Sequence, residues 1–341
     1  MVKLLDCTLR DGGYVNNWFF GKDSVIEITR LLEETNVNII EIGFLKNEPY
    51  EEDRTIFNTV EQISNIIHRK KIGIKYAAMI DAMNPISISE LQNRDENTVD
   101  IIRVMIWKTK HDENNNIVDC LNDGYEYCKK LVEKGYEVCV QPARVDQYSD
   151  EEFVKMIKLY QRLDPLAIYV VDSWGTLETE QVMHYVELAE KTMKPEIAIG
   201  YHGHNNMLQA FGTAVEFSNF ITRRELIIDA SVYGIGRCAG NLNLEIIAHY
   251  LNEYKQGNYE VAPMTVIYEK FIKKIREQNN WGYSIPYFIT GKYNCHPNYA
   301  NYLCFEKGVD SVTFEKIVSK IQGDDKIMFT KKLADEYLNK I

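Results

Sequence analysis

Two histidines separated by a single residue are the clearest chemical feature of the sequence. Residues 199–206 read Ile-Gly-Tyr-His-Gly-His-Asn-Asn and end a β-rich segment. Side chains two residues apart on a strand point to the same side, so His202 and His204 can reach one point, and we expect Gly203 to leave space between them. Two converging imidazoles are typical of a metal site. The alternative is a hydrogen-bonded pair of histidines with a structural role.

An arginine and an aspartate follow the first β-rich segment. Residues 6–14 read Asp-Cys-Thr-Leu-Arg-Asp-Gly-Gly-Tyr, so Arg10 and Asp11 stand side by side before a two-glycine turn. Taken alone, the two residues are also explained by an ordinary ion pair.

A glycine-rich segment precedes the helical pattern that starts near residue 243. Residues 233–241 read Tyr-Gly-Ile-Gly-Arg-Cys-Ala-Gly-Asn. Glycines permit tight turns and close approach of the backbone to a ligand, and such a loop at a helix start can hold an anion. A plain turn is the alternative.

These motifs stand in a chain that alternates between strand-like and helix-like segments. We predict strands at 2–6, 38–44, 73–80, 100–106, 136–141, 167–172, 196–202 and 226–232. Amphipathic helices are expected at 22–35, 51–68, 117–134, 149–162, 178–192, 206–218 and 243–254, with only a short helix at 84–92. Eight such units predict an α/β fold, a (β/α)8 TIM barrel over 1–254. An open doubly wound sheet is the alternative. Residues 255–341 are expected to form a mostly helical C-terminal extension.

Barrel closure places the first, seventh and eighth strands next to one another, so the three motifs meet at one rim. Asp11, His202 and His204 then form a two-histidine, one-carboxylate set with open coordination positions. A 2-oxo acid can chelate a divalent ion there, and the ion stabilises an enolate. Arg10 adds positive charge beside the developing oxyanion. Iron oxygenases use the same ligand set, usually on another fold.

Composition and charge narrow the classes of protein. The 341-residue chain has a formal net charge of −11 and no basic cluster, which disfavours nucleic acid as a partner. It has no apolar run of the about 20 residues that a transmembrane helix needs. The N-terminal residues read as a strand rather than a signal peptide, so we expect a cytoplasmic protein. The seven cysteines are odd in number and scattered, as expected for reduced thiols.

Together the three motifs resemble those of the metal-dependent lyase (DRE-TIM, HMG-CoA lyase-like) superfamily. Its members include 4-hydroxy-2-oxovalerate aldolase, 3-hydroxy-3-methylglutaryl-CoA lyase and the isopropylmalate and homocitrate synthases. Residues 6–12 match its D-x-T-L-R-D-G signature, residues 202–205 its H-x-H-N, and residues 234–241 its glycine-rich segment ending in G-N. The likeness covers about residues 3–250 and is strongest to the aldolase.

The resemblance implies roles for individual residues. Asp11, His202 and His204 resemble the metal ligands, and Asn241 resembles a further ligand or a residue that supports one. Arg10 resembles the catalytic arginine that stabilises the enolate.

On the substrate side, Ser173 resembles a serine near the pyruvate site of the aldolase, and Tyr283 resembles a tyrosine that lines the aldehyde side. Gly236 is expected to let the backbone approach the substrate.

Three departures from the family pattern concern catalysis. The aldolase has an acid/base histidine where this chain has Tyr14, whose ordinary pKa near 10 makes it a poor base. We expect Tyr14 to act as an acid toward an alkoxide, or a water to take over. Cys238 corresponds to the catalytic cysteine of the CoA lyase, but in a shorter loop, and we expect it to be buried and inert. The glutamine of the acetyl-CoA condensing enzymes is missing.

We therefore predict a divalent-metal-dependent aldolase or lyase that works through a pyruvate-type enolate. Mn²⁺ or Mg²⁺ is the expected ion, with Zn²⁺ or Co²⁺ as alternatives, and the reactants are a 2-oxo acid and an aldehyde. A homo-oligomer or an aldehyde dehydrogenase partner stays open. The alternative functions are an acyl-CoA lyase or Claisen condensing enzyme, and a non-catalytic barrel scaffold.

Several other polar residues have two interpretations. Some near strand ends either hold a substrate carboxylate or phosphate or are solvated rim charges: Lys46, Arg103, Lys108 and Arg144. His296, in the extension, is either structural or lines the pocket.

Overall fold

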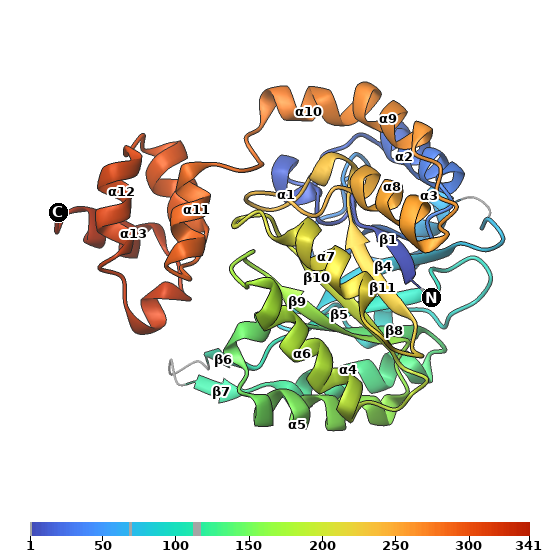
Figure 1. Ribbon diagram of the computed structural model, residues 1–341. Coiled ribbons are helices and arrows are strands. Elements are labelled where there is room, and N and C mark those ends of the chain that lie inside the picture. Colours follow the sequence, from blue (N-terminus) through green and yellow to red (C-terminus); the bar gives the residue numbers. More distant parts are fainter. Residues whose placement is uncertain (1, 68–69, 112–116) are drawn as a thin grey trace.

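The computed structural model describes residues 2–67, 70–111 and 117–341 and shows eight parallel strands closed into a barrel (Figure 1). The barrel strands are β1 (Val2–Asp6), β2 (Ile39–Leu45), β4 (Lys75–Asp81), β5 (Ile101–Ile106), β8 (Glu137–Pro142), β9 (Ala167–Asp172), β10 (Ala198–Gly203) and β11 (Leu226–Ala230). Strand β1 pairs with both β11 and β2, and this pairing closes the sheet. Each strand begins and ends within two residues of its predicted run, so the TIM-barrel prediction is confirmed.

Helices cover the outside of the barrel, as the amphipathic patterns predict. They are α2 (Lys22–Glu34), α3 (Val60–Ile67), α4 (Leu121–Glu133), α5 (Asp150–Tyr160), α6 (Thr179–Thr192), α7 (Ala210–Asn219) and α8 (Leu244–Lys255). In α2, the residues at helical spacing that face the barrel are buried: Val25, Ile28, Leu31 and Leu32. The link between β4 and β5 contains only a 3₁₀ turn, η1 (Ile88–Glu90), in place of the short helix expected at 84–92.

Two helix predictions were wrong in their first part because short strands occupy it. The helix expected from residue 51 begins at Val60, since β3 (Ile56–Phe57) extends the sheet beside β2. The helix expected from residue 117 begins at Leu121, since β7 (Ile117–Asp119) pairs antiparallel with β6 (Thr109–His111). The last residue of the 51–68 segment lies outside the described residues.

Inward-facing residues of the barrel form an apolar layer below a charged one. The lower layer belongs to a separate buried cluster that includes Leu5, Ile39, Ala77, Ile101, Cys139, Ala167, Ala198 and Ile227. Two positions further along three of these strands, Glu41, Arg103 and Asp229 are buried as well. The charged layer is therefore the floor beneath the carboxyl ends of the strands.

The extension continues from the barrel in two parts. The first part consists of α9 (Ala262–Ile267), the π-helical turn η5 (Tyr268–Ile272) and α10 (Lys273–Gln278). It adds Met264, Ile267 and Ile272 to the main hydrophobic core of the barrel. The second part contains α11 (Ile285–Lys292), η6 (Ala300–Glu306), α12 (Ser311–Val318) and α13 (Lys331–Leu338). Its hydrophobic cluster is separate from the main core and also includes Cys238 and Ala239 of the glycine-rich loop. The proposed division between 254 and 255 falls in the last turn of α8.

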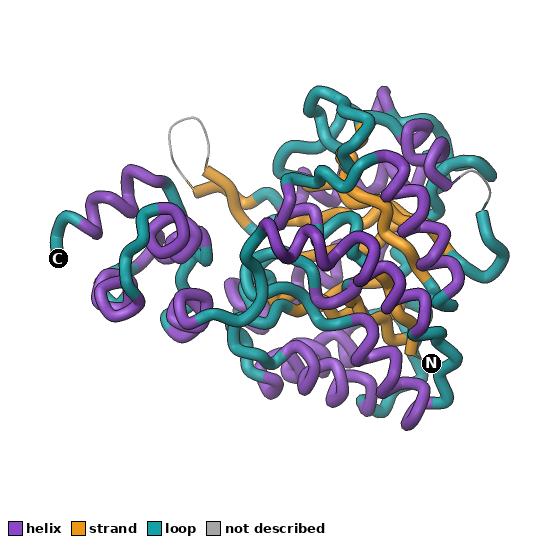
Figure 2. Tube along the Cα trace, turned by 90° about the horizontal axis from the view of Figure 1, so that it is seen from above, coloured by secondary structure: helices purple, strands orange, loops and turns teal. Residues whose placement is uncertain are grey.

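The second part lies beside the carboxyl ends of the barrel strands. Figures 1 and 2 both show this bundle set apart from the main body, with the β6–β7 hairpin extending toward it. Its position allows residues of the extension to face the barrel mouth. Among the described residues, no helix is long and apolar enough to cross a membrane.

Candidate active site

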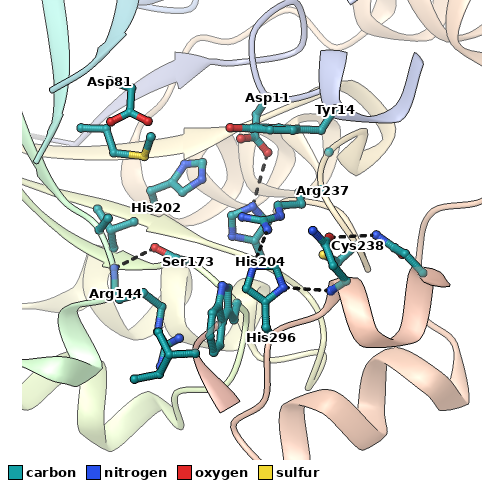
Figure 3. Close-up of a pocket in the computed structure, with 18 of the residues that line it drawn as sticks. Asp11, Tyr14, Asp81, Arg144, Ser173, His202, His204, Arg237, Cys238 and His296 are labelled. Atoms are coloured by element: carbon teal, nitrogen blue, oxygen red, sulfur yellow. Dashed lines mark hydrogen bonds and ion pairs between the residues drawn. The ribbon is translucent and has the colours of Figure 1, made fainter. Parts of the chain in front are cut away.

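Asp11, His202 and His204 converge at the mouth of the barrel. Asp11 follows β1, His202 lies in β10, and His204 comes directly after it. One ligand atom from each residue lies within 4.8 Å of those from the other two, and all three residues are buried. His204 Nε2 and Asp11 Oδ2 are 3.4 Å apart (Figure 3). The sequence motifs from strands β1 and β10 thus meet in space.

Hydrogen bonds orient both imidazole rings. Nδ1 of His202 lies 2.9 Å from Oδ2 of Asp229, and Nδ1 of His204 lies 3.0 Å from the carbonyl oxygen of Asp172. A carbonyl can only accept, so Nδ1 of His204 donates and its Nε2 carries the lone pair. Burial lowers the pKa of His202 even though the Asp229 carboxylate opposes this, so the ring favours its neutral form. Both rings are thereby prepared to act as ligands through Nε2.

Three buried acceptor atoms at this point have no hydrogen-bond partner in the described part of the chain. They are Asp11 Oδ2, His204 Nε2 and Asn241 Oδ1. Asn241 is fixed by a bridge to His204 and by donation from its Nδ2 to the Ile235 carbonyl at 3.0 Å. Buried acceptors are costly when left unpaired. Oxygen and imidazole donors of this kind fit a divalent cation.

Gly236 separates Asn241 from Asp11 and has to be a glycine. A Cβ at this position would lie 2.3 Å from Asn241 Nδ2 and 2.9 Å from Asp11 Oδ2. The glycine-rich loop therefore brings its backbone against Asn241 and Asp11, and the approach to a substrate expected for Gly236 stays a prediction. Gly203 was expected to leave space between the two histidines, but the close contact is on the other face of the strand. A Cβ at this position would lie 2.1 Å from the Tyr201 hydroxyl, away from the histidines.

A buried chain of charges supports the three residues from below. Arg10 pairs through Nη1 with Asp11, and its Nε donates to Glu41 Oε2 at 2.7 Å. Arg103 donates to the same Glu41 oxygen at 2.7 Å and also pairs with Asp229, which holds His202. The chain contains three carboxylates and two guanidinium groups, so it carries one excess negative charge that a divalent cation would offset.

The charge chain also keeps Asp11 ionised. Burial alone would raise the pKa of Asp11, but the Arg10 guanidinium outweighs it and holds the pKa well below its usual range. An ionised carboxylate is the form that binds a cation.

All but one of the other predicted site residues line the cavity at the barrel mouth. Arg10, Tyr14, Ser173 and Gly236 line it, and Ser173 Oγ accepts the backbone N–H of Arg144 at 2.9 Å. Tyr283 is 52% exposed, in the linker before α11, and is not among the lining residues. Four residues further on, Tyr287 of α11 lines the cavity instead.

The structure also shows where the polar residues with two interpretations lie. Arg144 and His296 line the cavity, whereas Arg103 is fully buried in the charged layer. Lys46 lies over the Trp18 ring with its Nζ 4.5 Å from the centroid, and Lys108 pairs with Glu152 at 2.6 Å.

Sequence reasoning missed Glu41 and Asp229. Each is the single acidic residue in an otherwise apolar strand, Ile-Ile-Glu-Ile and Leu-Ile-Ile-Asp-Ala. A carboxylate inside a fully buried strand is rarely tolerated without a partner, and this was the signal available.

Tyr14 and Cys238 are both disfavoured as anions. Tyr14 is 39% exposed as a residue, but desolvation of its hydroxyl raises the pKa, although Arg237 beside its ring opposes this. Burial raises the pKa of Cys238 to about 11, which leaves the thiol protonated at neutral pH.

Comparison with known proteins agrees with the motifs. The family described as HMGL-like matches residues 1–265. The 4-hydroxy-2-oxovalerate aldolase of Bacillus cereus (strain ATCC 10987 / NRS 248) is 26% identical over 257 residues, 74% of this chain and 70% of the aldolase. The oxaloacetate decarboxylase of Mycobacterium tuberculosis (strain ATCC 25618 / H37Rv) is 23% identical over 281 residues, 78% of this chain and 74% of that protein.

Solved structures agree at the level of the fold. The HMG-CoA lyase of Bacillus subtilis superimposes with a TM-score of 0.62 at 15% identity, over 82% of this chain and 93% of the lyase. The family match covers more than half of the sequence and includes all three motifs. This chain belongs to the HMGL-like family.

Proposed function

We propose that this protein is a divalent-metal-dependent aldolase that makes or breaks a carbon–carbon bond next to the keto group of a pyruvate-type 2-oxo acid. The observation that carries the proposal is the convergence of Asp11 Oδ2, His204 Nε2 and Asn241 Oδ1, buried and without partners in the described residues, beside Arg10. The named activities of its aldolase and decarboxylase relatives support the same chemistry.

The donor set favours Mn²⁺ or Mg²⁺, with Zn²⁺ or Co²⁺ as further candidates. Asp11, His202 and His204 would hold the ion, and Asn241 would add its amide oxygen or support a ligand. When bound, the ion would act as a Lewis acid toward the keto oxygen and make removal of a methyl proton less costly.

Arg10 stabilises negative charge on the same oxygen. Its Nε and Nη1 are held by Glu41 and Asp11, and its Nη2 has no hydrogen bond within the described ranges. A guanidinium fixed on two sides needs little reorganisation to donate its third nitrogen to an oxyanion.

Tyr14 is suited to donate a proton rather than to accept one. Its raised pKa keeps the hydroxyl protonated at neutral pH. In the addition direction, the enolate carbon bonds to the aldehyde carbon, and the aldehyde oxygen gains the proton. Tyr14 lines the cavity and serves as this donor in our account.

The alternative acyl-CoA chemistry is less well supported. Cys238, which stands where the CoA lyase has its catalytic cysteine, is only 7% exposed and its pKa is raised to about 11. We also propose that the protein is cytoplasmic. We further propose that it associates with other copies of itself or with an aldehyde dehydrogenase, and size-exclusion chromatography would reveal either association.

Exchange of the pyruvate methyl protons in D2O, followed by NMR with Mg²⁺ present, tests the proposal. We expect the methyl signal to disappear in proportion to protein and Mg²⁺. We expect Asp11→Asn to slow the exchange about 100-fold or more, the scale of a lost site interaction of about 2.7 kcal/mol. Asp23→Asn, on the exposed side of α2, is the matched control and should behave like the unaltered protein.

Two results would count against the aldolase proposal. One is an Asp11→Asn protein that exchanges at the normal rate. The other is an absence of exchange in metal-loaded protein even after an aldehyde is added, in which case acetyl-CoA would be tested as the donor.

A further inference from the structure

The cavity above the metal-ligand residues is larger than a small 2-oxo acid and a short aldehyde require. Its volume is about 1040 Å³, and its wall combines the barrel mouth with residues of the extension such as Tyr287, His296 and Asn301. Pockets of about 300–1,000 Å³ accommodate drug-sized ligands. An acceptor of several more atoms than acetaldehyde therefore fits.

Two hydrogen-bond donors face each other on this wall, and no described residue places an acceptor between them. The backbone N–H of Asn298 donates to Nδ1 of His296 at 3.1 Å, so the neutral ring carries its proton on Nε2. That Nε2 lies 3.5 Å from Nη2 of Arg237 (Figure 3). A guanidinium nitrogen can only donate, so these two groups cannot satisfy each other.

Arg144 supplies a third donor. It is 4% exposed, and Asp146 accepts from its Nε at 2.7 Å and from its Nη2 at 2.6 Å. Its Nη1 is buried and has no partner among the residues that the structure describes. The guanidinium carbon lies 3.2 Å from the centroid of the Trp174 ring, whose other neighbour is the His296 ring at 5.1 Å. Arg144 and His296 thus border the same part of the cavity.

Arg237 brings a positive charge without a carboxylate partner among the described residues to this part of the cavity. Within the described ranges, the charge of Arg144 is balanced by Asp146 alone. Burial, followed by the charges of Arg237 and Arg144, lowers the pKa of His296 to about 3. Besides Asp11, the acidic residues among the described ones that line the cavity are Asp81, Glu306 and Asp324. Of these, Asp81 accepts from the Trp107 indole, and Glu306 pairs with Lys331.

Hydrogen bonds within the extension fix the His296 region. The Tyr287 hydroxyl donates to Asn301 Oδ1 at 2.6 Å, and Asn301 Nδ2 donates to Asn298 Oδ1 at 3.2 Å. Asn298 in turn holds His296. The His296 ring is therefore positioned before any ligand binds, which lowers the entropic cost of binding.

We propose that the acceptor aldehyde of this enzyme carries an anionic group, a phosphate or a carboxylate, which binds between Arg237 and His296, on the side of the cavity that Arg144 borders. This inference rests on the proposed aldolase function. An anionic oxygen at this place would accept from donors that have no acceptor in the part of the chain that the structure describes, and guanidinium groups are well suited to both anions. In the view of Figure 3, Arg144 and His296 lie on the side of the cavity away from Asp11, as a second substrate requires.

Matched pairs of aldehydes test the proposal, with pyruvate and Mg²⁺ held constant. Glyceraldehyde 3-phosphate is compared with glyceraldehyde, and succinic semialdehyde with butanal, by the rate of pyruvate consumption. At least one anionic aldehyde should have a kcat/KM about 30-fold or more above its neutral partner, the scale of one charged contact. The pair that shows the preference distinguishes phosphate from carboxylate. Equal values in both pairs would overturn the proposal.

Variants assign the preference to these residues. In Arg237→Gln the ratio of anionic to neutral kcat/KM should fall toward one, and Arg237→Lys should restore part of it. Arg223→Gln is the control, because Arg223 is exposed just before β11, at the opposite end of the barrel. A preference that survives in Arg237→Gln and in His296→Gln would contradict the assignment.

Binding of inorganic phosphate separates this proposal from the aldolase proposal. Pyruvate exchange without aldehyde reports on the aldolase function alone. The full chain, dialysed against EDTA, is titrated with phosphate while the histidine ring protons are followed by NMR, with His296→Gln used to assign the signal. We expect the His296 signal to move in the unaltered protein and in Arg223→Gln, but not in Arg237→Gln. A His296 signal that stays fixed at millimolar phosphate in every form, together with equal kcat/KM values, would refute the anion site.

Discussion

Replacement of Arg103 by methionine tests the role of the charged layer inside the barrel. Arg103 and its two partners, Glu41 and Asp229, have no exposed side-chain surface. The variant keeps a side chain of similar length but leaves both carboxylates without this guanidinium. Removing one partner of a buried ion pair costs about 3–5 kcal/mol, because the remaining charge is buried without compensation. Arg10 still pairs with Glu41, so we expect a value near the lower end, about 3 kcal/mol.

Urea denaturation at pH 7, followed by circular dichroism, measures this cost. The double variant Arg103→Met/Asp229→Asn should recover about 1–3 kcal/mol of the loss, because Asp229 is the carboxylate that is left without a guanidinium. Arg30→Met is the control: Arg30 lies on the exposed face of α2, and we expect a change of less than about 1 kcal/mol. A loss below about 1 kcal/mol for Arg103→Met, or no recovery in the double variant, would refute the reasoning.

Three further predictions concern the site itself. Gly236→Ala should lower Mn²⁺ affinity about 10-fold or more in calorimetry, because its Cβ would displace Asn241 and Asp11, whereas unchanged affinity would mean that the loop moves freely. Because the pKa of Tyr14 is raised, loss of its proton should slow aldol addition only above about pH 10. A fall in rate near pH 8 that is absent from the Tyr14→Phe variant would contradict this. Cys238→Ala should retain initial rates within about threefold, since a thiol with a pKa of about 11 is protonated at neutral pH, and a loss of 100-fold or more would favour the acyl-CoA chemistry.

The barrel could be predicted because its signal is repeated eight times. Apolar runs of five to seven residues between amphipathic helices leave few other arrangements, and each strand was placed within two residues. Strand β3 has two residues and β6 and β7 have three each, which is too short for any periodicity to show. Such strands are defined by their partners in space, and single-sequence patterns do not contain that information.

The site was predictable where chemistry and spacing coincide in one stretch of sequence. The i, i+2 spacing of His202 and His204 and the adjacent Arg10 and Asp11 are local features. The charge chain through Glu41, Arg103 and Asp229 depends on contacts between residues 62 and 126 positions apart, so the sequence showed only isolated charges. The resemblance places an aldehyde-side tyrosine at position 283, whereas the tyrosine of the extension that lines the cavity is Tyr287. A motif match outside the barrel has no strand to fix its register.

A crystal of the protein soaked with Mn²⁺ and measured for anomalous scattering tests the central claim most directly. The account predicts one strong peak within about 2.0–2.3 Å of Asp11 Oδ2, His202 Nε2 and His204 Nε2. It also predicts that Asn241 Oδ1 faces the peak directly or through one water. A well-ordered site without a peak at millimolar Mn²⁺, or a peak that contacts none of the three residues, would contradict it.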